Sequence, residues 1–328
     1  MTTAVLKIQK LLNFYLCSRN LVTVAWPYAA VLAAHTIWGI NFVVAKVTLQ
    51  EVPPMSLAFV RFTLATLLLL PFLLIERDKL KISKKDLPQL IAIGALMSTL
   101  NIALFYLGIA RTTATTASVL TMTIPVVSVL TAWWIFKEKI YTFNLFGILL
   151  GLLGAALVIG LPVYILGTSL FSEAILGNLL IILASISWVA GAILSKKMLT
   201  KYSTLTITAI VFLVGMITFA LPAAVEYFQN PSWPLKMTFL GIFGIIYIAV
   251  LSSTSAYFLF EWGLGKLGVV KADLFQYIEP VIAVTLGILL LGEQIRFTFV
   301  IGALLIGLGV YWSTLAKEQH KHHKAHRV

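Results

Sequence analysis

The sequence predicts an all-α integral membrane protein with ten transmembrane helices, arranged as two inverted five-helix repeats. Three observations carry this prediction: the composition is strongly apolar, the apolar residues occur in runs of about 20, and the second half of the chain repeats motifs of the first. Hydrophobic residues make up 60% of the 328 residues and charged residues 11%, with a mean hydropathy of +0.99. Because soluble domains have about 25% charged residues, soluble, disordered and fibrous proteins are excluded.

Ten apolar stretches are separated by charged or Pro/Gly-rich breaks. Each is close to the ~20 residues that cross a bilayer as a helix, and the backbone in lipid must be paired within such helices. The stretches cover residues 26–47, 55–75, 88–110, 113–136, 143–161, 175–196, 204–225, 236–258, 269–291 and 297–316.

The positions of lysine and arginine predict the orientation. With both termini in the cytoplasm, 19 of the 24 Lys and Arg residues fall in inside segments and 4 in outside segments, while Arg61 lies within a span. Cytoplasmic loops are enriched in positive residues, so this orientation accounts for the net charge of +12 without nucleic acid as a partner. A signal peptide is rejected because the first run continues to Val47 without a cleavage pattern. The single cysteine, Cys17, excludes an intrachain disulfide.

Glycine, proline and glutamate positions of the first half recur in the second half at an offset of 155 residues. The pairs are Gly108 and Gly263, Pro125 and Pro280, Glu138 and Glu293, Gly147 and Gly302, and Gly154 and Gly309. Earlier in each half, Trp38 and Lys46 recur as Trp188 and Lys196 at an offset of 150. Each half holds five spans, an odd number, so the second half enters the membrane in the opposite orientation, as in many secondary transporters.

The chain therefore divides into five segments. These are a cytoplasmic N-terminal segment (1–25), a first repeat (26–161), a linker (162–174), a second repeat (175–316) and a basic, His-rich cytoplasmic tail (317–328). For the tail, metal binding and contact of a flexible basic segment with an anionic leaflet are both open.

Short motifs recur within both repeats. The first half contains Trp38-Gly39-Ile40-Asn41-Phe42, Pro53-Pro54, Arg61-Phe62, Ile124-Pro125-Val126 and Lys137-Glu138-Lys139, and the second contains Ile278-Glu279-Pro280-Val281 and Leu291-Gly292-Glu293-Gln294. These motifs are similar to those of EamA-type members of the drug/metabolite transporter superfamily over about residues 30–316. The resemblance implies ten helices in two inverted bundles around a central substrate cavity. It leaves the substrate open among amino acids, other metabolites and toxic compounds.

Two charged residues lie inside predicted spans. Glu279 directly precedes Pro280, whose missing N–H predicts a bent or broken helix. The first-half counterpart of Glu279 is Ile124, so the repeated scaffold does not require the acid. A proton- or cation-coupling site and a structural carboxyl group are both open. For Arg61, a clamp for an anionic substrate group and a structural arginine bonded to helix-end carbonyl groups are both open.

Polar and aromatic residues of other spans complete the predicted substrate site. His35, Trp38 and Asn41 recur at three-residue steps on one helix face, and His35 fits either a titrating or a hydrogen-bonded packing role. The further candidates are Asn101, Trp188, Tyr257, Gln276 and Tyr277.

Other recurring residues predict structural roles. Glu138 and Glu293, at span ends, are expected to bond backbone donors at the start of the next helix, and Glu261 is expected at the membrane interface near the inner end of its span. Close helix approach is expected at Gly147, Gly151, Gly154, Gly302, Gly307 and Gly309.

These features predict a secondary transporter that exports small amino-acid-like or amphipathic metabolites by alternating access. The expected location is a prokaryotic inner membrane, and the expected partners are a small-molecule substrate and the bilayer, with a homodimer as an option. No catalytic or nucleotide-binding motif is present in the sequence, so neither enzyme activity nor a cofactor is expected. A flippase for lipid-linked substrates, a membrane-embedded enzyme, and a channel or structural subunit remain as alternatives.

Overall fold

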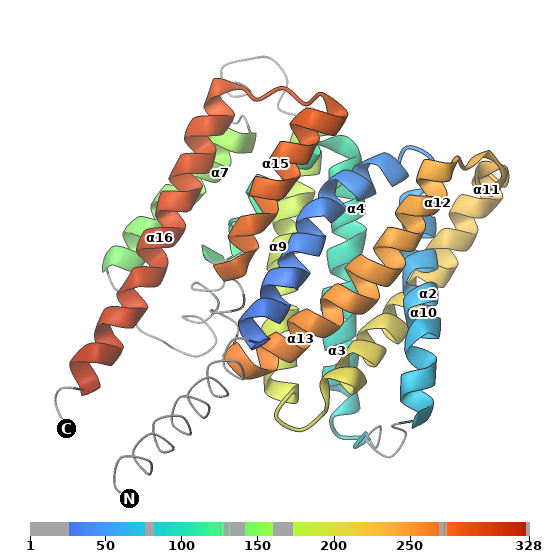
Figure 1. Cartoon of the computed structure of the whole chain (residues 1–328), viewed down its shortest axis with the longest axis horizontal. Coiled ribbons are helices and arrows are strands. Elements are labelled where there is room, and N and C mark those ends of the chain that lie inside the picture. The colour runs from blue at the N-terminus through green and yellow to red at the C-terminus, as the bar shows by residue number, and fades with distance from the viewer. Residues whose placement is uncertain are drawn as a thin grey trace, which may run out of the picture.

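The computed structural model describes residues 26–75, 82–124, 126–127, 131, 142–159, 173–268, 272 and 274–325, and every regular element in these ranges is helical (Figure 1). Six of the described helical segments are long and apolar enough to cross a membrane. These are the first helix (Trp26–Thr48), α2 (Pro54–Ile75), Leu87–Arg111, α9 (Glu173–Met198), α10 (Thr204–Gln229) and Phe239–Leu267. The remaining elements are α5 (Ala114–Thr121), α7 (Thr142–Ile159), the short α11 (Trp233–Lys236), α15 (Ile278–Leu291) and α16 (Phe297–Ala325). The molecule is therefore an all-α, multi-pass membrane protein.

Most described helix ends lie within a few residues of the expected ones. Among the exceptions, α5 ends at Thr121 although its span was expected to continue to 136, and α15 begins at Ile278 although its span was expected from 269. The eighth predicted span was expected to end at 258 but continues to Leu267, so Glu261 lies inside the helix rather than near its end. The last helix continues to Ala325, into the segment for which we expected a flexible tail. Pro125, Glu138 and most of the predicted linker lie outside the described residues.

Two long helices have a π-helical segment in the middle. Leu87–Arg111 consists of α3 (Leu87–Gly94), a π segment (Ala95–Leu100) and α4 (Asn101–Arg111). Phe239–Leu267 consists of α12 (Phe239–Ile246), a π segment (Tyr247–Ser255) and α13 (Ala256–Leu267). Each is the third span of its half. Wider π turns are rare and occur frequently at functional sites, and here they occur in matched parts of the two halves.

The helix before Glu279 is interrupted, as Pro280 predicted. A 3₁₀ turn over Leu274–Tyr277 precedes α15, which begins at Ile278. Pro280 therefore lies in the first turn of α15, where the backbone N–H that proline lacks would have no partner within the helix.

Matched helices of the two halves run antiparallel. The carbonyl oxygen of Pro27, at the start of the first helix, lies beside Gly263 near the end of α13. Lys196, at the end of α9, donates a hydrogen bond to the carbonyl oxygen of Leu264 at the same end of α13. The start of the first helix and the end of α9 thus lie at one end of the bundle.

Lys46 and Lys196 match in sequence and make matched contacts. Lys46 Nζ donates to carbonyl oxygens at the end of α4, including those of Ile109 (2.9 Å) and Thr112 (2.6 Å). Lys196 Nζ donates to the carbonyl oxygen of Leu264 (3.1 Å), the counterpart of Ile109 at the 155-residue offset. Ammonium groups at helix C-termini satisfy free carbonyl groups and complement the helix dipole. In each half, the matched lysine therefore caps the C-terminal end of the third span.

The last helices of the halves, α7 and α16, lie side by side at one edge of the molecule (Figure 1). A methyl group on Gly154 would lie 2.6 Å from the carbonyl oxygen of Gly302, and one on Gly309 would lie 2.5 Å from that of Gly147. Glycine is therefore required for this close approach, as the sequence predicted. The prediction is wrong for Gly307, which has no atom within 4 Å of where a methyl group would be.

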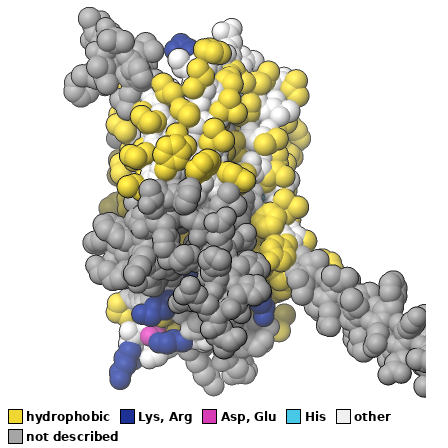
Figure 2. Space-filling view, turned by 90° about the vertical axis from the view of Figure 1, so that its left-hand side faces the viewer, with side chains coloured by type: hydrophobic (Ala, Val, Ile, Leu, Met, Phe, Trp, Pro, Cys, Tyr) yellow, Lys and Arg dark blue, Asp and Glu magenta, His cyan; other side chains and the backbone are white. Residues whose placement is uncertain are grey.

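Apolar side chains also cover the outside of the molecule. Figure 2 shows the face on the α7–α16 side, where the described surface is largely hydrophobic and Lys and Arg gather toward its lower end. Exposed apolar residues on other outer faces include Phe72, Leu221 and Phe239, of which Leu221 is 75% exposed. A soluble monomer rarely exposes so much contiguous apolar surface, whereas a lipid-facing helix surface does.

Candidate functional site

A cavity of about 90 Å³ lies between the halves, and residues from both halves line it. Nine of the ten residues predicted as candidates are in its wall: His35, Trp38, Asn41, Arg61, Asn101, Trp188, Tyr257, Gln276 and Glu279. The tenth, Tyr277, is not in the wall; it packs against an apolar cluster formed by α5, α15 and neighbouring helices.

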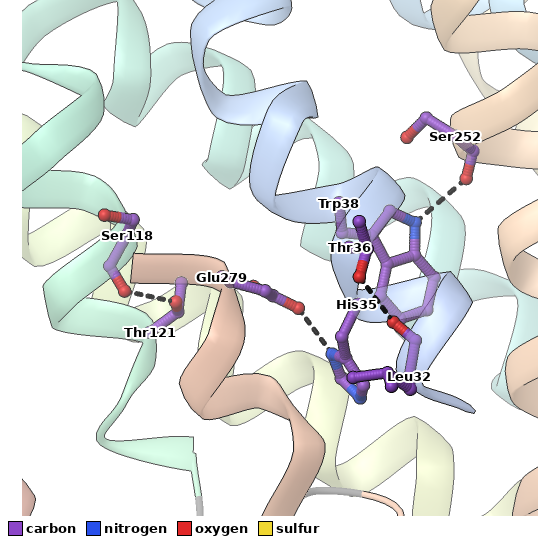
Figure 3. Close-up of polar contacts among 8 residues, drawn as sticks. All are labelled: Leu32, His35, Thr36, Trp38, Ser118, Thr121, Ser252 and Glu279. Atoms are coloured by element: carbon purple, nitrogen blue, oxygen red, sulfur yellow. Dashed lines mark hydrogen bonds and ion pairs between the residues drawn. The ribbon is translucent and has the colours of Figure 1, made fainter. Parts of the chain in front are cut away.

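Glu279 and His35 form a buried pair that joins the second half to the first (Figure 3). The distance from His35 Nδ1 to Glu279 Oε1 is 2.6 Å, and both side chains are at most 5% exposed. Glu279 lies in the first turn of α15, where the helix dipole favours a negative charge. His35 Nε2 has no hydrogen-bond partner among the described residues. The pair can therefore hold a proton between its two groups, with one imidazole nitrogen left for a ligand.

Arg61 lies deep in the protein rather than at a helix end. The residue is 1% exposed and lines the cavity. Its Nε donates to Ser253 Oγ (2.9 Å), and an NH1 hydrogen bond goes to the hydroxyl of Tyr106 (2.9 Å). The guanidinium carbon also lies 5.0 Å from the ring centroid of Phe62. Neither hydrogen-bond acceptor is a helix-end carbonyl group, so the structural alternative considered for Arg61 does not describe its contacts.

The positive charge of Arg61 has no acidic partner within the described ranges of the chain. No ion pair involves this residue there, and both of its hydrogen-bond acceptors are neutral hydroxyl groups. A guanidinium group has five N–H donors in a fork that matches a carboxylate or phosphate. The cavity therefore presents an uncompensated cation with donors to spare, which suits an anionic group of a ligand.

Matched tryptophans meet at the cavity. The rings of Trp38 and Trp188 contact each other edge to face, with centroids 5.3 Å apart, and both contact Tyr257. Trp38 Nε1 donates to the carbonyl oxygen of Ser252 at 2.9 Å, within the second π segment (Figure 3). Residues that match in an internal repeat and touch each other must lie near the axis that relates the two halves. The cavity therefore lies close to this axis.

Several polar groups of the wall have no partner among the residues that the structure describes. Besides His35 Nε2, these are Asn41 Oδ1 and Ser252 Oγ. Asn101, in contrast, donates from Nδ2 to the carbonyl oxygen of Ala184 at 2.9 Å and so joins α4 to α9. Buried polar atoms are usually hydrogen-bonded, so the unpartnered ones mark places where water or a substrate is expected to bind.

The sequence did not identify part of the wall. The residues not singled out are Phe42, Ile102, Phe105, Thr121, Ile124, Ala184 and Ser185. Most are apolar or small, and such residues in a membrane helix look the same whether they face a cavity, a neighbouring helix or lipid. Thr121 donates its hydroxyl hydrogen to the Ser118 carbonyl oxygen (Figure 3), an ordinary contact in membrane helices. Tyr106, the partner of Arg61, was also missed.

Carboxylates also tie the two halves together at residues outside the cavity wall. Glu226 of α10 accepts hydrogen bonds from the N–H groups of Met55 and Ser56 at the start of α2. Glu293 accepts hydrogen bonds from the N–H groups of Ala114 (2.8 Å) and Thr115 (2.9 Å) at the start of α5. The predicted backbone-bonding role of Glu293 is thus correct, but the predicted helix is wrong: Glu293 caps a helix of the first half rather than the next helix, α16.

Two further carboxylates lie outside the membrane-spanning segments. Glu51 accepts hydrogen bonds from the hydroxyl and the N–H of Thr238, and these bonds hold the pKa of Glu51 below its ordinary value. Asp86 accepts hydrogen bonds from the Tyr202 hydroxyl (2.8 Å) and from Lys201 Nζ (3.0 Å). The Tyr202 bond, followed by that of Lys201, lowers the pKa of Asp86. Each contact joins a loop of one half to the start of the third span of the other half.

Comparison with known proteins agrees with this architecture. The model of the EamA-like transporter family matches residues 25–160 and again residues 175–315. An uncharacterized transporter of Archaeoglobus fulgidus is 31% identical over 86% of this chain and 95% of its own length. The uncharacterized transporter YoaV of Bacillus subtilis is 24% identical over 89% of this chain and 97% of its own length. A crystal structure shares the fold with a TM-score of 0.62 at 18% identity, over 89% of this chain and 98% of that one. The chain belongs to the EamA-like transporter family.

Proposed function

We propose that this protein is a secondary transporter whose ten membrane helices form two inverted five-helix halves around the cavity. Four structural features support the proposal. Matched helices run antiparallel, the third span of each half has a π segment, Lys46 and Lys196 close matched helix ends, and Trp38 and Trp188 meet between the halves. Two similar halves of opposite orientation can pack in two conformations of similar energy, and each conformation opens the cavity to a different side of the membrane.

The substrate is proposed to be a small amino-acid-like or amphipathic metabolite. The observation that carries this proposal is the buried guanidinium of Arg61, which lines the cavity and whose hydrogen-bond acceptors among the described residues are neutral hydroxyl groups. A substrate carboxylate would supply the missing negative charge. The aromatic rings of Trp38, Trp188 and Tyr257 offer apolar contact for the rest of the molecule.

Glu279 and His35 are proposed as the coupling site. Glu279 belongs to the second half and His35 to the first, so a rocking motion of the halves changes the distance between them. In one of the two conformations, a proton or a substrate amine binds the Glu279 carboxyl group and so competes with His35 for it. Coupling then follows from the difference in proton affinity between the two conformations.

The orientation and direction are further parts of the proposal. The distribution of lysine and arginine favours cytoplasmic termini, and a location in a prokaryotic inner membrane is proposed with it. Export of the metabolite is the proposed net direction, driven by an inward proton gradient through the coupling site.

A flux assay tests the transport proposal. The purified protein is reconstituted in liposomes, and uptake of a panel of amino acids, amphipathic amines and organic anions is measured with and without a pH gradient. We expect saturable flux of at least one compound class and counterflow when unlabelled compound is placed on the opposite side. Flux without saturation or counterflow would indicate a channel, and no flux from correctly folded, inserted protein would contradict the proposal.

A further inference from the structure

The interface between α9 and α13 buries a carboxyl group that the proposed transport site does not use. Glu261 of α13 is fully buried, and its Oε2 accepts a hydrogen bond from Ser195 Oγ of α9 at 2.6 Å. Its Oε1 has no hydrogen-bond partner, and no ion pair forms with the group, within the part of the chain that the structure describes. An unpaired carboxylate is expensive inside a membrane protein, so the group needs a proton or a cation.

The cationic groups of the helices around Glu261 are engaged elsewhere. Lys196, the residue after Ser195 on α9, donates to carbonyl oxygens at the end of α13. His35 of the first helix, whose ring contacts that of Phe260, is bonded to Glu279. Lys197 of α9 and Lys266 of α13 are exposed. None of these side chains neutralises the carboxyl group.

The remaining packed elements offer only neutral or acidic groups. Tyr257, one turn before Glu261 on α13, donates its hydroxyl hydrogen to the carbonyl oxygen of Met97 (3.1 Å). The sole charged residue of α10 is Glu226, which lies at the far end of that helix and caps α2. The π segment Tyr247–Ser255 has no charged residue. Among the residues that the structure describes, the environment of Glu261 therefore contains one hydroxyl donor, Ser195, and no counter-ion.

The first half shows that the scaffold does not require an acid here. At the 155-residue offset, Glu261 corresponds to Tyr106, which is bonded to Arg61. At the 150-residue offset, Arg61 corresponds to Val211 and Ser195 corresponds to Ala45. The second half thus has no arginine at the position that bonds Tyr106 in the first half, and it has a serine–glutamate pair instead. The matched position holds a tyrosine bonded to an arginine in one half and a carboxyl group bonded to a hydroxyl in the other, so the repeated scaffold does not explain the acid.

We propose that Glu261, with Ser195, is a second proton-binding site, separate from Glu279 and one helical turn from the cavity wall at Tyr257. The ligand is a proton because a metal cation needs several oxygen or nitrogen ligands. The described residues contain no group of three or more His, Cys, Asp or Glu side chains that would hold one. Proton binding at Glu261 does not depend on the proposed transport function. Only the use of this proton to drive transport rests on that function.

Infrared spectroscopy of the reconstituted protein at neutral pH tests this site without a substrate. Surface carboxyl groups are ionised at this pH, so the carbonyl stretch of protonated carboxyl groups, identified by its shift in D₂O, reports the buried ones. Wild type is compared with Glu261→Gln, with Glu279→Gln and with the control Glu173→Gln, whose side chain is 78% exposed. We expect Glu261→Gln to remove one component that Glu279→Gln and Glu173→Gln retain. An unchanged spectrum in Glu261→Gln would overturn the proposal.

A second variant covers the case in which Glu261→Gln does not fold. Ser195→Ala keeps the carboxyl group and removes its only described hydrogen bond. We expect the same component to remain and to move to higher frequency, because a less strongly bonded carbonyl group has a stiffer stretch. If the frequency of this component does not change in Ser195→Ala, the assignment to Glu261 is overturned. If the component behaves as expected but no compound is transported, the transport proposal fails and the proton site stands.

Discussion

Arg61 has five N–H donors in the protein interior, and two of them are used by neutral hydroxyl groups. The two bonds come from different nitrogen atoms of the fork, Nε and NH1. A lysine has one nitrogen on a flexible stem and cannot keep this geometry. The two bonds therefore hold a planar cation in a fixed orientation at the cavity, and we propose that it binds an anionic group of the substrate.

The variant Arg61→Lys tests this reading in the flux assay. We expect the KM for a carboxylate substrate to rise at least tenfold, about 1.4 kcal/mol of lost binding, while flux of cationic compounds changes little. Tyr106→Phe is the matched control, because it removes one neutral partner and keeps the guanidinium. An equal loss for anionic and cationic compounds would contradict the anion-contact role.

Glu279→Gln tests proton coupling at the His35 pair. The amide keeps a hydrogen-bonding group of similar shape beside His35 but cannot gain or lose a proton. We expect counterflow to persist and stimulation of flux by a pH gradient to disappear. Glu173→Gln, at an exposed ion pair with Arg111, is the control that should retain the stimulation. If stimulation survives in Glu279→Gln, the coupling role is wrong.

At the scale of helices, the α7–α16 contact depends on glycine at specific points. In Gly154→Ala the new methyl group would lie 2.6 Å from a backbone oxygen and 2.7 Å from a backbone nitrogen, neither of which moves easily. We expect a loss of about 1–3 kcal/mol, the usual cost of overpacking, seen as a lower Tm in detergent. Gly307→Ala meets nothing within 4 Å and should keep or slightly raise the Tm, because alanine favours the helix more than glycine does. Equal Tm values for the two variants would contradict the close-packing account.

The contact between Asp86 and the Tyr202–Lys201 loop predicts a pH effect on stability. Because the folded-state pKa of Asp86 is lowered, Asp86 contributes to the free energy of unfolding. This contribution is fully present above the unfolded-state pKa of about 3.9. It is lost as the pH falls through the folded-state pKa. We expect the Tm of Asp86→Asn to be lower than that of wild type at neutral pH and the difference to shrink in acid. If the Tm difference between wild type and Asp86→Asn grows on acidification, the pKa of Asp86 is not lowered in the folded state.

Much of the helix pattern was predictable because a bilayer imposes a single length and an apolar composition on each span. The ends were less predictable where no charge or proline marks them. Glu261 was placed at an interface because its neighbours suggested a helix end, yet α13 continues to Leu267. A charged residue inside an apolar run looks the same in sequence whether it ends a helix or is buried against a hydroxyl group such as that of Ser195.

The site was predictable to the extent that polarity in a membrane helix is unusual. His35, Asn41, Arg61 and Glu279 stand out for this reason, and all line the cavity. Their partners were not predictable, because the pairing of His35 with Glu279 depends on helix packing between residues far apart in the chain. Tyr277 was included because a continuous helix would place it on a face that adjoins that of Gln276 and Glu279. Residues 274–277 instead form a 3₁₀ turn, of which Gln276 lines the cavity and Tyr277 does not.

At the scale of the whole molecule, matched residues meet near the axis that relates the two halves. Trp38 contacts Trp188, and Phe62 contacts Phe212, its counterpart at the same 150-residue offset. This axis passes close to the cavity. Contacts at the two ends of the bundle, such as Glu51 with Thr238 and Asp86 with Tyr202, lie farther from it and would open and close in turn.

Access to the cavity from the two sides of the membrane tests the central claim most directly. Ser185 is buried and lines the cavity, and the chain has one native cysteine, Cys17. In a Cys17→Ser background, Ser185→Cys would be exposed to a membrane-impermeant thiol reagent added to one side of oriented vesicles and then to the other. We predict labelling from either side, with each reagent blocking the other. Labelling from one side only, or from neither, would contradict alternating access through this cavity.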